Sequence, residues 1–287
     1  MTLSVVIITY NEEANIARTL ESVMPLVRDG KGEIIVVDSG STDRTVEIAR
    51  SFGAKVFVEG WRGFAAQKNS ALDKASGDWI LSLDADEEVD RELRDEILEL
   101  MSLGNNETLQ KLSRGSYDAW IHRDAELTVQ YEDQREGPLA GVEIARKNYF
   151  MGRWVRRGGF YPDRKLRLFK RGSAVFDKRK VHEDPKTSGF TVRFRGALLH
   201  HSYPTLSDYI EHMNRYSSLG AEMAVEKGDR GFSFTNIVLR PWATFVYNYF
   251  FRLGFLDGPE GLLLHLYHAV YVSWKYAKAW ELGKKSR

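Results

Sequence analysis

The chain has 287 residues, of which 43% are hydrophobic and 28% are charged, so it is long enough for one large globular domain with an appendage. Its 41 basic and 40 acidic residues leave a net charge of +1, which gives no overall attraction to nucleic acid and excludes it as an expected partner. The sequence contains no cysteine, which excludes disulfides, thiol catalysis and zinc–thiolate sites and is compatible with a reducing compartment.

The first hundred residues repeat one pattern, in which an apolar, β-branched run is followed by a polar loop and then by a segment of helical periodicity. The opening run ends at Thr9, too early for a signal peptide, so we expect a buried strand there. We expect strands at 4–9, 33–37, 54–58 and 79–83, and helices at 12–26, after Ser41 as the N-cap, and at 64–75. This alternation predicts an α/β fold with a parallel sheet covered by helices on both faces.

Polar clusters follow three of these strands at their carboxyl ends. They have the sequences TYNEE at 9–13, DSGSTD at 38–43 and DAD at 84–86. In open parallel sheets ligands bind outside the carboxyl ends of the strands, so the three clusters predict a nucleotide-binding cleft at one edge of the sheet.

The last cluster carries two carboxylates, Asp84 and Asp86, two residues apart. In an extended chain such residues point to the same side and can converge on a divalent cation such as Mg²⁺ or Mn²⁺. The alternative is that they form the acidic first turn of a helix expected at 90–101.

The order of the motifs TYNE, DSGSTD, QKN and DADE resembles family 2 glycosyltransferases of the GT-A fold. Downstream, the segments RKNYFMGRW, YPD, LRLF, VHE and LH resemble one branch, the bacterial lipopolysaccharide core β-glucosyltransferases. The resemblance covers about residues 3–103 and 141–283. It implies a GT-A nucleotide-diphospho-sugar transferase fold with a C-terminal helical extension.

The resemblance also implies an activity, namely inverting, metal-dependent transfer of a hexose, with glucose as the expected sugar, from a UDP-sugar to a lipid-linked saccharide such as lipopolysaccharide core. Transfer to a polyprenyl-phosphate carrier or an exopolysaccharide repeat is the alternative acceptor. A non-catalytic nucleotide-sugar-binding protein is the alternative from another class. A sugar-nucleotide-forming enzyme is disfavoured, because the first strand is not followed by a glycine-rich loop.

Family motifs assign the donor contacts to specific residues. The base and ribose would be bound by Thr9, Tyr10 and Glu12, with the ring of Tyr10 able to stack. Asp38 would accept from the uracil N–H, although Ser39 stands where many relatives carry a second acid. Lys68 would contact the diphosphate. Asp84 would contact the ribose or a metal-bound water. A solvated helical lysine is the alternative for Lys68.

The metal ligands implied by the resemblance are Asp86, Asp84 and a late histidine, His200. The adjacent His201 stays open as the ligand, and a buried structural role is the alternative for His200.

The general base that deprotonates the acceptor hydroxyl would be Glu183, with Asp184 and Asp163 as rivals. The basic residues nearby could hold a diphosphate or a phosphorylated acceptor, or could simply form a solvated face; they are Arg164, Lys165, Arg167, Lys170 and Arg171.

We expect a catalytic domain at 1–204, with a variable insertion or mobile loop at 104–140, and an amphipathic helical region at 205–287. In that region an amphipathic helix is predicted at 206–227, followed by an aromatic segment at 242–251 between Arg240 and Arg252 and a longer apolar segment at 261–280. We predict interfacial helices that touch a membrane surface, on the inner, cytoplasmic side. Packing on the catalytic domain, a homo-oligomer contact and a membrane span are the alternatives.

Overall fold

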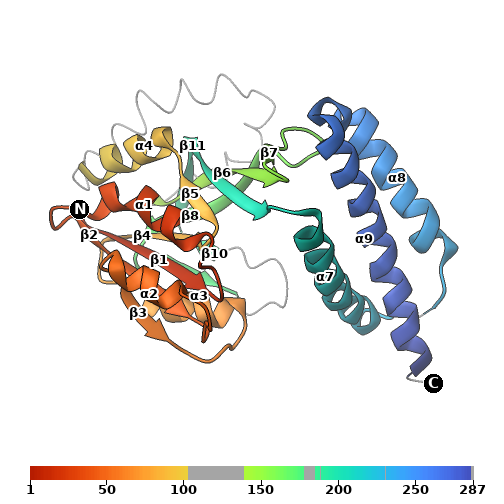
Figure 1. The fold of residues 1–287 in the computed structure, drawn as a ribbon, viewed down its shortest axis with the longest axis horizontal. Coiled ribbons are helices and arrows are strands. Elements are labelled where there is room, and N and C mark those ends of the chain that lie inside the picture. Colours follow the sequence, from red (N-terminus) through yellow and green to blue (C-terminus); the bar gives the residue numbers. More distant parts are fainter. Residues whose placement is uncertain (103–138, 178–184, 188, 230, 286–287) are drawn as a thin grey trace. The chain divides into compact units, whose positions relative to one another are not determined.

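The computed structural model describes residues 1–102, 139–177, 185–187, 189–229 and 231–285 (Figure 1). Two compact units divide the chain: the first comprises Met1–Ala145 and Arg164–Leu199, and the second comprises Arg146–Asp163 and His200–Arg287. The insertion predicted at 104–140 lies almost wholly outside the described residues.

The amino-terminal half of the first unit has the alternating elements that the sequence predicts. Its parallel strands are β1 (Leu3–Thr9), β2 (Gly32–Asp38), β3 (Lys55–Val58) and β4 (Trp79–Asp84), and the helices between them are α1 (Ile16–Val27), α2 (Thr45–Ser51) and α3 (Phe64–Asp73). In the register of the sheet Thr9 pairs with Asp38, and Ile8 pairs with Asp84. The ends of three neighbouring strands therefore meet at one edge, as expected.

The four strands predicted from the first hundred residues are parallel, and beyond β4 the sheet becomes mixed. β4 pairs in the antiparallel sense with β8 (Asp163–Lys170). The nine-stranded sheet has the order β3-β2-β1-β4-β8-β6-β11-β5, with β7 paired to β6. Its remaining strands are β5 (Glu87–Val89), β6 (Leu139–Phe150), β7 (Arg153–Trp154) and β11 (Phe190–Tyr203), and a separate antiparallel pair is formed by β9 (Ala174–Phe176) and β10 (Pro185–Thr187).

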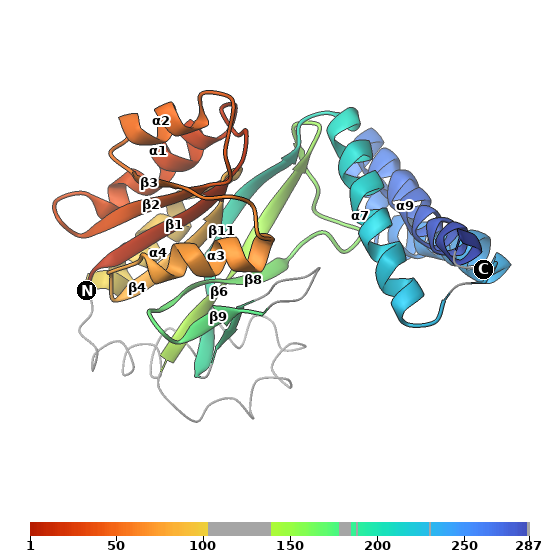
Figure 2. The ribbon, with the colours of Figure 1, turned by 90° about the horizontal axis from the view of Figure 1, so that it is seen from below.

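Successive residues of each strand point to opposite sides of the sheet, so its buried strands present apolar side chains on both faces. Helices cover both of these faces. On one face Val5 and Ile7 join the apolar residues of α1 and of α4 (Arg91–Ser102) in one buried cluster. On the other face Val6 packs in a second cluster with residues of α3 and β8. Figure 2 shows α1 and α2 on one side of β1 and α3 on the other.

The helix α2 begins later than the sequence predicts. Thr45 is its first residue and Arg44 its N-cap, so Ser41 does not cap it. Instead Ser41 Oγ donates to Asp38 and accepts from the backbone N–H of Asn11, at 2.8 Å. The polar residues of this loop therefore hold the ends of β1 and β2 together rather than starting a helix.

The second unit is mainly helical. It contains α7 (Leu206–Glu226), a π-helical turn η3 (Thr235–Leu239), α8 (Arg240–Val246), a second π-helical turn η4 (Tyr247–Phe251), a 3₁₀ turn η5 (Gly254–Asp257) and α9 (Gly258–Lys285). Thr205 and Asp208 form a capping box at the start of α7, and α9 packs against both α7 and α8 (Figure 1). Among the helices that the structure describes, none has the length and apolar character needed to cross a membrane.

Candidate functional site

The carboxyl end of β1 presents two residues predicted to bind a donor. Thr9 is buried, and its hydroxyl oxygen has no hydrogen-bond partner among the described residues. A buried polar atom without a partner is costly in a folded protein, so this hydroxyl fits a position that a ligand completes. Tyr10 follows with 56% of its surface exposed, so its ring is accessible for stacking.

Asp38, at the carboxyl end of β2, is fully buried. Its Oδ1 accepts from the backbone N–H groups of Gly40 and Ser41, at 2.9 and 2.8 Å, and its Oδ2 accepts from Ser41 Oγ. The carboxylate thus shapes the loop that follows the strand. A nucleotide base would have to share Oδ2 with the serine hydroxyl.

Glu12 lies in the turn before α1, close to two aspartates of other loops. Burial raises the pKa of its carboxyl group, and the negative charges of Asp86 and Asp43 raise it further, while a hydrogen bond from Asn15 opposes them. The distance from Asn15 Nδ2 to Glu12 Oε2 is 2.8 Å. The strand ends therefore carry an excess of negative charge, which favours either a bound cation or hydroxyl donors.

Asp84 is held by two cations. Lys68 Nζ lies 2.9 Å from its Oδ1, and Arg167 Nη2 lies 2.6 Å from its Oδ2. Burial alone would raise the pKa of this carboxyl group, but Arg167 and Lys68 hold the pKa well below its usual value. The lysine is buried rather than solvated, so the solvated-helix alternative for Lys68 is wrong.

The same arginine also binds a second carboxylate. Arg167 Nη2 lies 2.6 Å from Oε1 of the fully buried Glu87, whose Oε2 accepts from the backbone N–H of Asp84 at 3.0 Å. Arg167 is therefore a buried cation under the strand ends, so the solvated-face alternative is wrong for this residue, and its binding of a phosphate stays a prediction. Sequence reasoning missed Glu87 altogether, because its partner lies 80 residues away in the chain.

Asp86 lies in the turn between β4, which ends at Asp84, and β5, which begins at Glu87. The extended-chain argument for its convergence with Asp84 is therefore wrong, because the chain turns between them. The helix-start alternative is also wrong, since α4 begins at Arg91. Asp86 is partly exposed and contributes to the negative field at Glu12, and carboxylate oxygens of this kind suit Mg²⁺ or Mn²⁺.

The described residues contain no group of three or more His, Cys, Asp or Glu side chains arranged to hold a metal ion. His200 belongs to the second unit and Asp86 to the first, so their joint ligation of one ion stays a prediction.

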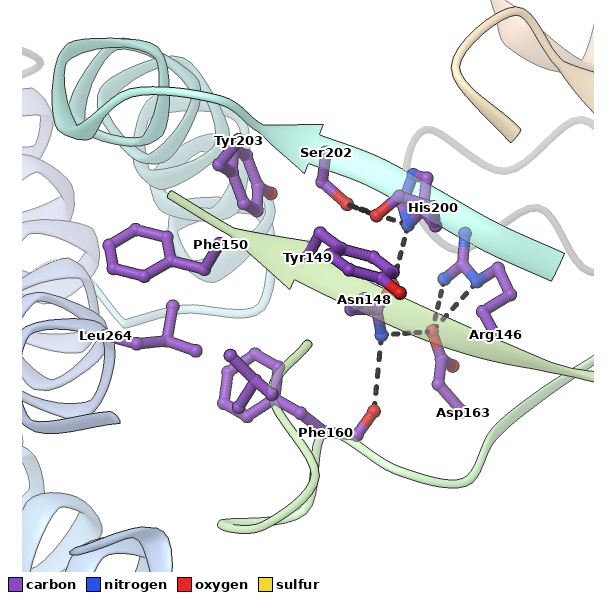
Figure 3. A pocket seen from close by; sticks show the side chains of 11 residues that line it. Arg146, Asn148, Tyr149, Phe150, Phe160, Asp163, His200, Ser202, Tyr203 and Leu264 are labelled. Carbon is purple, nitrogen blue, oxygen red and sulfur yellow. Dashed lines mark hydrogen bonds and ion pairs between the residues drawn. The ribbon is translucent and has the colours of Figure 1, made fainter. Parts of the chain in front are cut away.

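His200 lines a cavity of about 200 Å³ within the second unit (Figure 3). Asn148 Nδ2 donates to Phe160 O and to Asp163 Oδ2, at 3.2 and 3.3 Å, which turns Asn148 Oδ1 toward His200 Nδ1 at 2.6 Å. An amide oxygen only accepts, so Nδ1 carries the proton and the lone pair lies on Nε2. A histidine fixed in this tautomer is suited to metal ligation. The neighbouring His201 instead stacks on Tyr149, with ring centroids 5.0 Å apart.

Of the three candidates for the general base, the structure describes one. Glu183 and Asp184 lie outside the described residues. Asp163 is described, and Arg146 donates to its Oδ2 through Nε at 2.9 Å and Nη2 at 2.5 Å. The basic residues near β8 have their own partners as well: Arg171 Nε donates to Gly77 O at 3.0 Å, and Lys170 lies over the ring of Trp79.

Comparisons with known proteins agree with this arrangement. A family model described as glycosyl transferase family 2 matches residues 4–198. The lipopolysaccharide core biosynthesis glycosyltransferase LpsC of Rhizobium meliloti (strain 1021) is 30% identical, over 97% of this chain and 92% of its own length. An uncharacterized glycosyltransferase of Rickettsia typhi is 31% identical, over 99% of this chain and 89% of its own length.

Among solved structures, a mannosyltransferase from Pyrobaculum calidifontis in complex with GDP-Man and Mn²⁺ superimposes with a TM-score of 0.50. It is 16% identical and covers 96% of this chain and 86% of its own, so the likeness shows the fold. The mixed sheet with helices on both faces and the match over residues 4–198 lead to one conclusion: the chain belongs to glycosyl transferase family 2 and is a glycosyltransferase with the GT-A fold.

Proposed function

We propose that this glycosyltransferase moves a hexose, with glucose as the leading candidate, from a UDP-sugar to a lipid-linked saccharide such as lipopolysaccharide core, with inversion at the anomeric carbon. The observation that carries the proposal is the acidic edge of the sheet, where Glu12 and Asp86 concentrate negative charge and where β1 ends in the buried Thr9 hydroxyl, which has no partner among the described residues. The acceptor class follows from the similarity to LpsC, which extends over nearly the whole of both chains.

In this proposal the donor is bound at the carboxyl ends of β1 and β2. Tyr10 stacks on the base, Thr9 supplies a hydroxyl that its own fold leaves without a partner, and Asp38 offers a carboxylate oxygen already fixed by its loop. Lys68 stays with Asp84, and the pair presents little net charge to the diphosphate.

Because of this pairing, an anionic diphosphate would meet the negative charge of Glu12 and Asp86. A divalent cation held by Asp86 would neutralise the diphosphate oxygens of the departing UDP. Glu183 would then take the proton of the attacking hydroxyl.

The second unit would hold the enzyme against a membrane. Between residues 232 and 256 many large apolar side chains are exposed, among them Trp242 at 66% and Phe251 at 75%. Within this stretch Arg240 and Arg252 flank the aromatic segment 242–251. Aromatic rings and arginines together favour the interface of an anionic lipid surface, where a lipid-linked acceptor resides.

The test is an assay of the purified protein with a panel of nucleotide sugars, in Mn²⁺ and in chelator, with deacylated core oligosaccharide or polyprenyl phosphate as acceptor. We expect UDP-sugar turnover that needs the metal and the oligosaccharide. Turnover only with polyprenyl phosphate would move the acceptor to that carrier. If neither UDP nor Mn²⁺ bound to the protein in calorimetry, the donor proposal would be wrong.

A further inference from the structure

The cavity in the second unit combines an apolar end with a polar end. In the view of Figure 3, Phe150 and Leu264 lie at one end, and Arg146, Asp163 and His200 lie at the other. Phe150, Val155 and Leu264 are almost fully buried, and the polar side chains are partly exposed. This composition suits a ligand that has both apolar faces and several hydroxyl groups.

The size of the cavity selects a small ligand. Its volume of about 200 Å³ is below the roughly 300 Å³ at which sites for drug-sized ligands begin. One sugar ring fits such a space, whereas a nucleotide diphosphate does not.

The charge of the cavity selects a neutral ligand. Arg146 donates both Nε and Nη2 to Asp163, so the cation is compensated within the wall. A phosphate group is best bound by cations that no carboxylate already neutralises. Hydroxyl groups both donate and accept hydrogen bonds, and an amide or hydroxyl oxygen can accept more than one, so Asn148 Oδ1 and Ser202 Oγ, which both contact His200 Nδ1, keep acceptor capacity for a ligand hydroxyl.

From these features we infer that the cavity is a binding subsite for one neutral pyranose ring of the acceptor, with the ring lying against the aromatic wall and its hydroxyls toward Asn148, Asp163 and Ser202. The inference rests on the proposed transfer to a saccharide. Tyr149 is the wall residue best suited to a test, because it lines the cavity and is only partly buried.

The first experiment uses the full chain and its variants Tyr149→Ala and Tyr149→Phe, with deacylated core oligosaccharide as acceptor. We expect Tyr149→Ala to raise the acceptor KM about 10-fold or more with donor affinity unchanged, because the aromatic wall of the cavity is lost and no predicted donor contact is altered. Tyr149→Phe keeps the ring and should restore most of the affinity. Phe57→Ala is the control, since that aromatic side chain is 38% exposed, belongs to the first unit and does not line the cavity. An unchanged acceptor KM in folded Tyr149→Ala, as judged by circular dichroism, would overturn the inference.

The second experiment separates this inference from the proposed function. Saturation-transfer NMR with methyl pyranosides and, separately, phosphorus NMR titration with inorganic phosphate need no turnover. We expect saturation transfer to at least one methyl pyranoside, lost in Tyr149→Ala, and no specific phosphate binding at the cavity. If no methyl pyranoside binds, or if phosphate binds and Arg146→Ala abolishes that binding, the neutral-sugar subsite is wrong even where donor turnover is normal. If UDP-sugar turnover is absent but a pyranoside binds, the proposed function fails and the subsite stands.

Discussion

Asp86 is the residue on which the predicted metal site depends most, because Asp84 is already paired with Lys68 and Arg167. We expect Asp86→Ala to reduce sugar transfer by at least about 100-fold, since a metal ion that stabilises a leaving diphosphate contributes several kcal/mol to the transition state. Metal-dependent UDP binding, followed by calorimetry with and without Mn²⁺, should be lost in the same variant. Asp95→Ala on α4 is the control, as that side chain is 58% exposed and has no role in the proposed donor or metal site. Undiminished transfer by Asp86→Ala in the presence of Mn²⁺ would remove Asp86 from the site.

Arg167 holds two acids at once, one of them fully buried. We expect Arg167→Met to lower the free energy of unfolding by about 3–5 kcal/mol, because removing one partner leaves buried carboxylates without a compensating cation. The control is Lys55→Met, which breaks the pair with Glu33 at a lysine side chain that is 64% exposed and should cost about 1 kcal/mol or less. Urea denaturation at neutral pH measures both. Equal losses in the two variants would show that the buried pairing adds nothing.

Residues that end a strand were predictable at this site, and side-chain pairs between distant elements were not. Thr9, Asp38 and Asp84 each end a strand whose apolar pattern is unmistakable, and the register of a parallel sheet brings such ends together. The bond between Arg167 and Glu87 joins β8 to β5, and no local pattern reports which of five neighbouring basic residues turns inward. Burial in the folded sheet decides that choice.

At the scale of elements, periodicity located the strands and helices but not how each loop uses its polar residues. Ser41 and Asp43 both have the chemistry of an N-cap, yet Ser41 bonds to Asp38 while Asp43 Oδ1 accepts from the N–H of Thr45 at 3.0 Å. A side chain that caps a helix and one that hydrogen-bonds within a loop come from the same residue types, so the sequence does not distinguish them. The antiparallel β8 was equally hidden, because the direction of pairing depends on a strand far along the chain.

The exposed aromatic stretch around α8 gives the membrane proposal its test. We expect the double variant Trp242→Ser, Phe251→Ser to bind vesicles of phosphatidylethanolamine and phosphatidylglycerol at least about 10-fold more weakly, because two large apolar side chains no longer enter the lipid interface. Cosedimentation measures the binding, and Phe57→Ser, a partly exposed aromatic of the first unit, is the control. If the wild-type protein does not bind these vesicles, and light scattering gives a lower mass for the double variant than for the wild type, the stretch is an oligomer contact instead.

His265 on α9 makes the second unit sensitive to acid. It is 1% exposed, both ring nitrogens lack partners among the described residues, and Gly158 and Gly254 pack against its ring. Burial, aided by the nearby His268, lowers the pKa of His265 from 6.5 to about 4. His265 therefore binds a proton more weakly in the folded state than in the unfolded state.

Since the folded pKa is the lower one, the contribution of His265 to stability is complete above pH 6.5 and is lost as the pH falls toward 4. We expect a loss of at most about 3 kcal/mol across this window. His265→Leu should lack this part of the slope in urea denaturation at successive pH values. The same slope in wild type and variant would show that other groups cause the acid sensitivity.

At the scale of the whole molecule, the residues assigned to the donor belong to the first unit and those lining the sugar subsite to the second. Separate measurements of donor binding, acceptor affinity and turnover can therefore assign each residue to a step. Family membership predicts that the chain transfers a sugar. It does not predict which sugar, because that depends on side chains that can differ between this chain and LpsC at 30% identity.

The general base is the assignment that most needs this separation. We expect Glu183→Gln to keep UDP-sugar binding and acceptor affinity while turnover falls about 10²- to 10⁴-fold, because an amide cannot accept the hydroxyl proton. Asp163→Asn should behave differently: its carboxylate is bound to Arg146, so its loss should raise the acceptor KM more than it lowers kcat. Asp184→Asn is the matched control for the neighbouring acid. Normal turnover in Glu183→Gln, together with a collapse of kcat in Asp184→Asn or Asp163→Asn, would transfer the role of base to that aspartate.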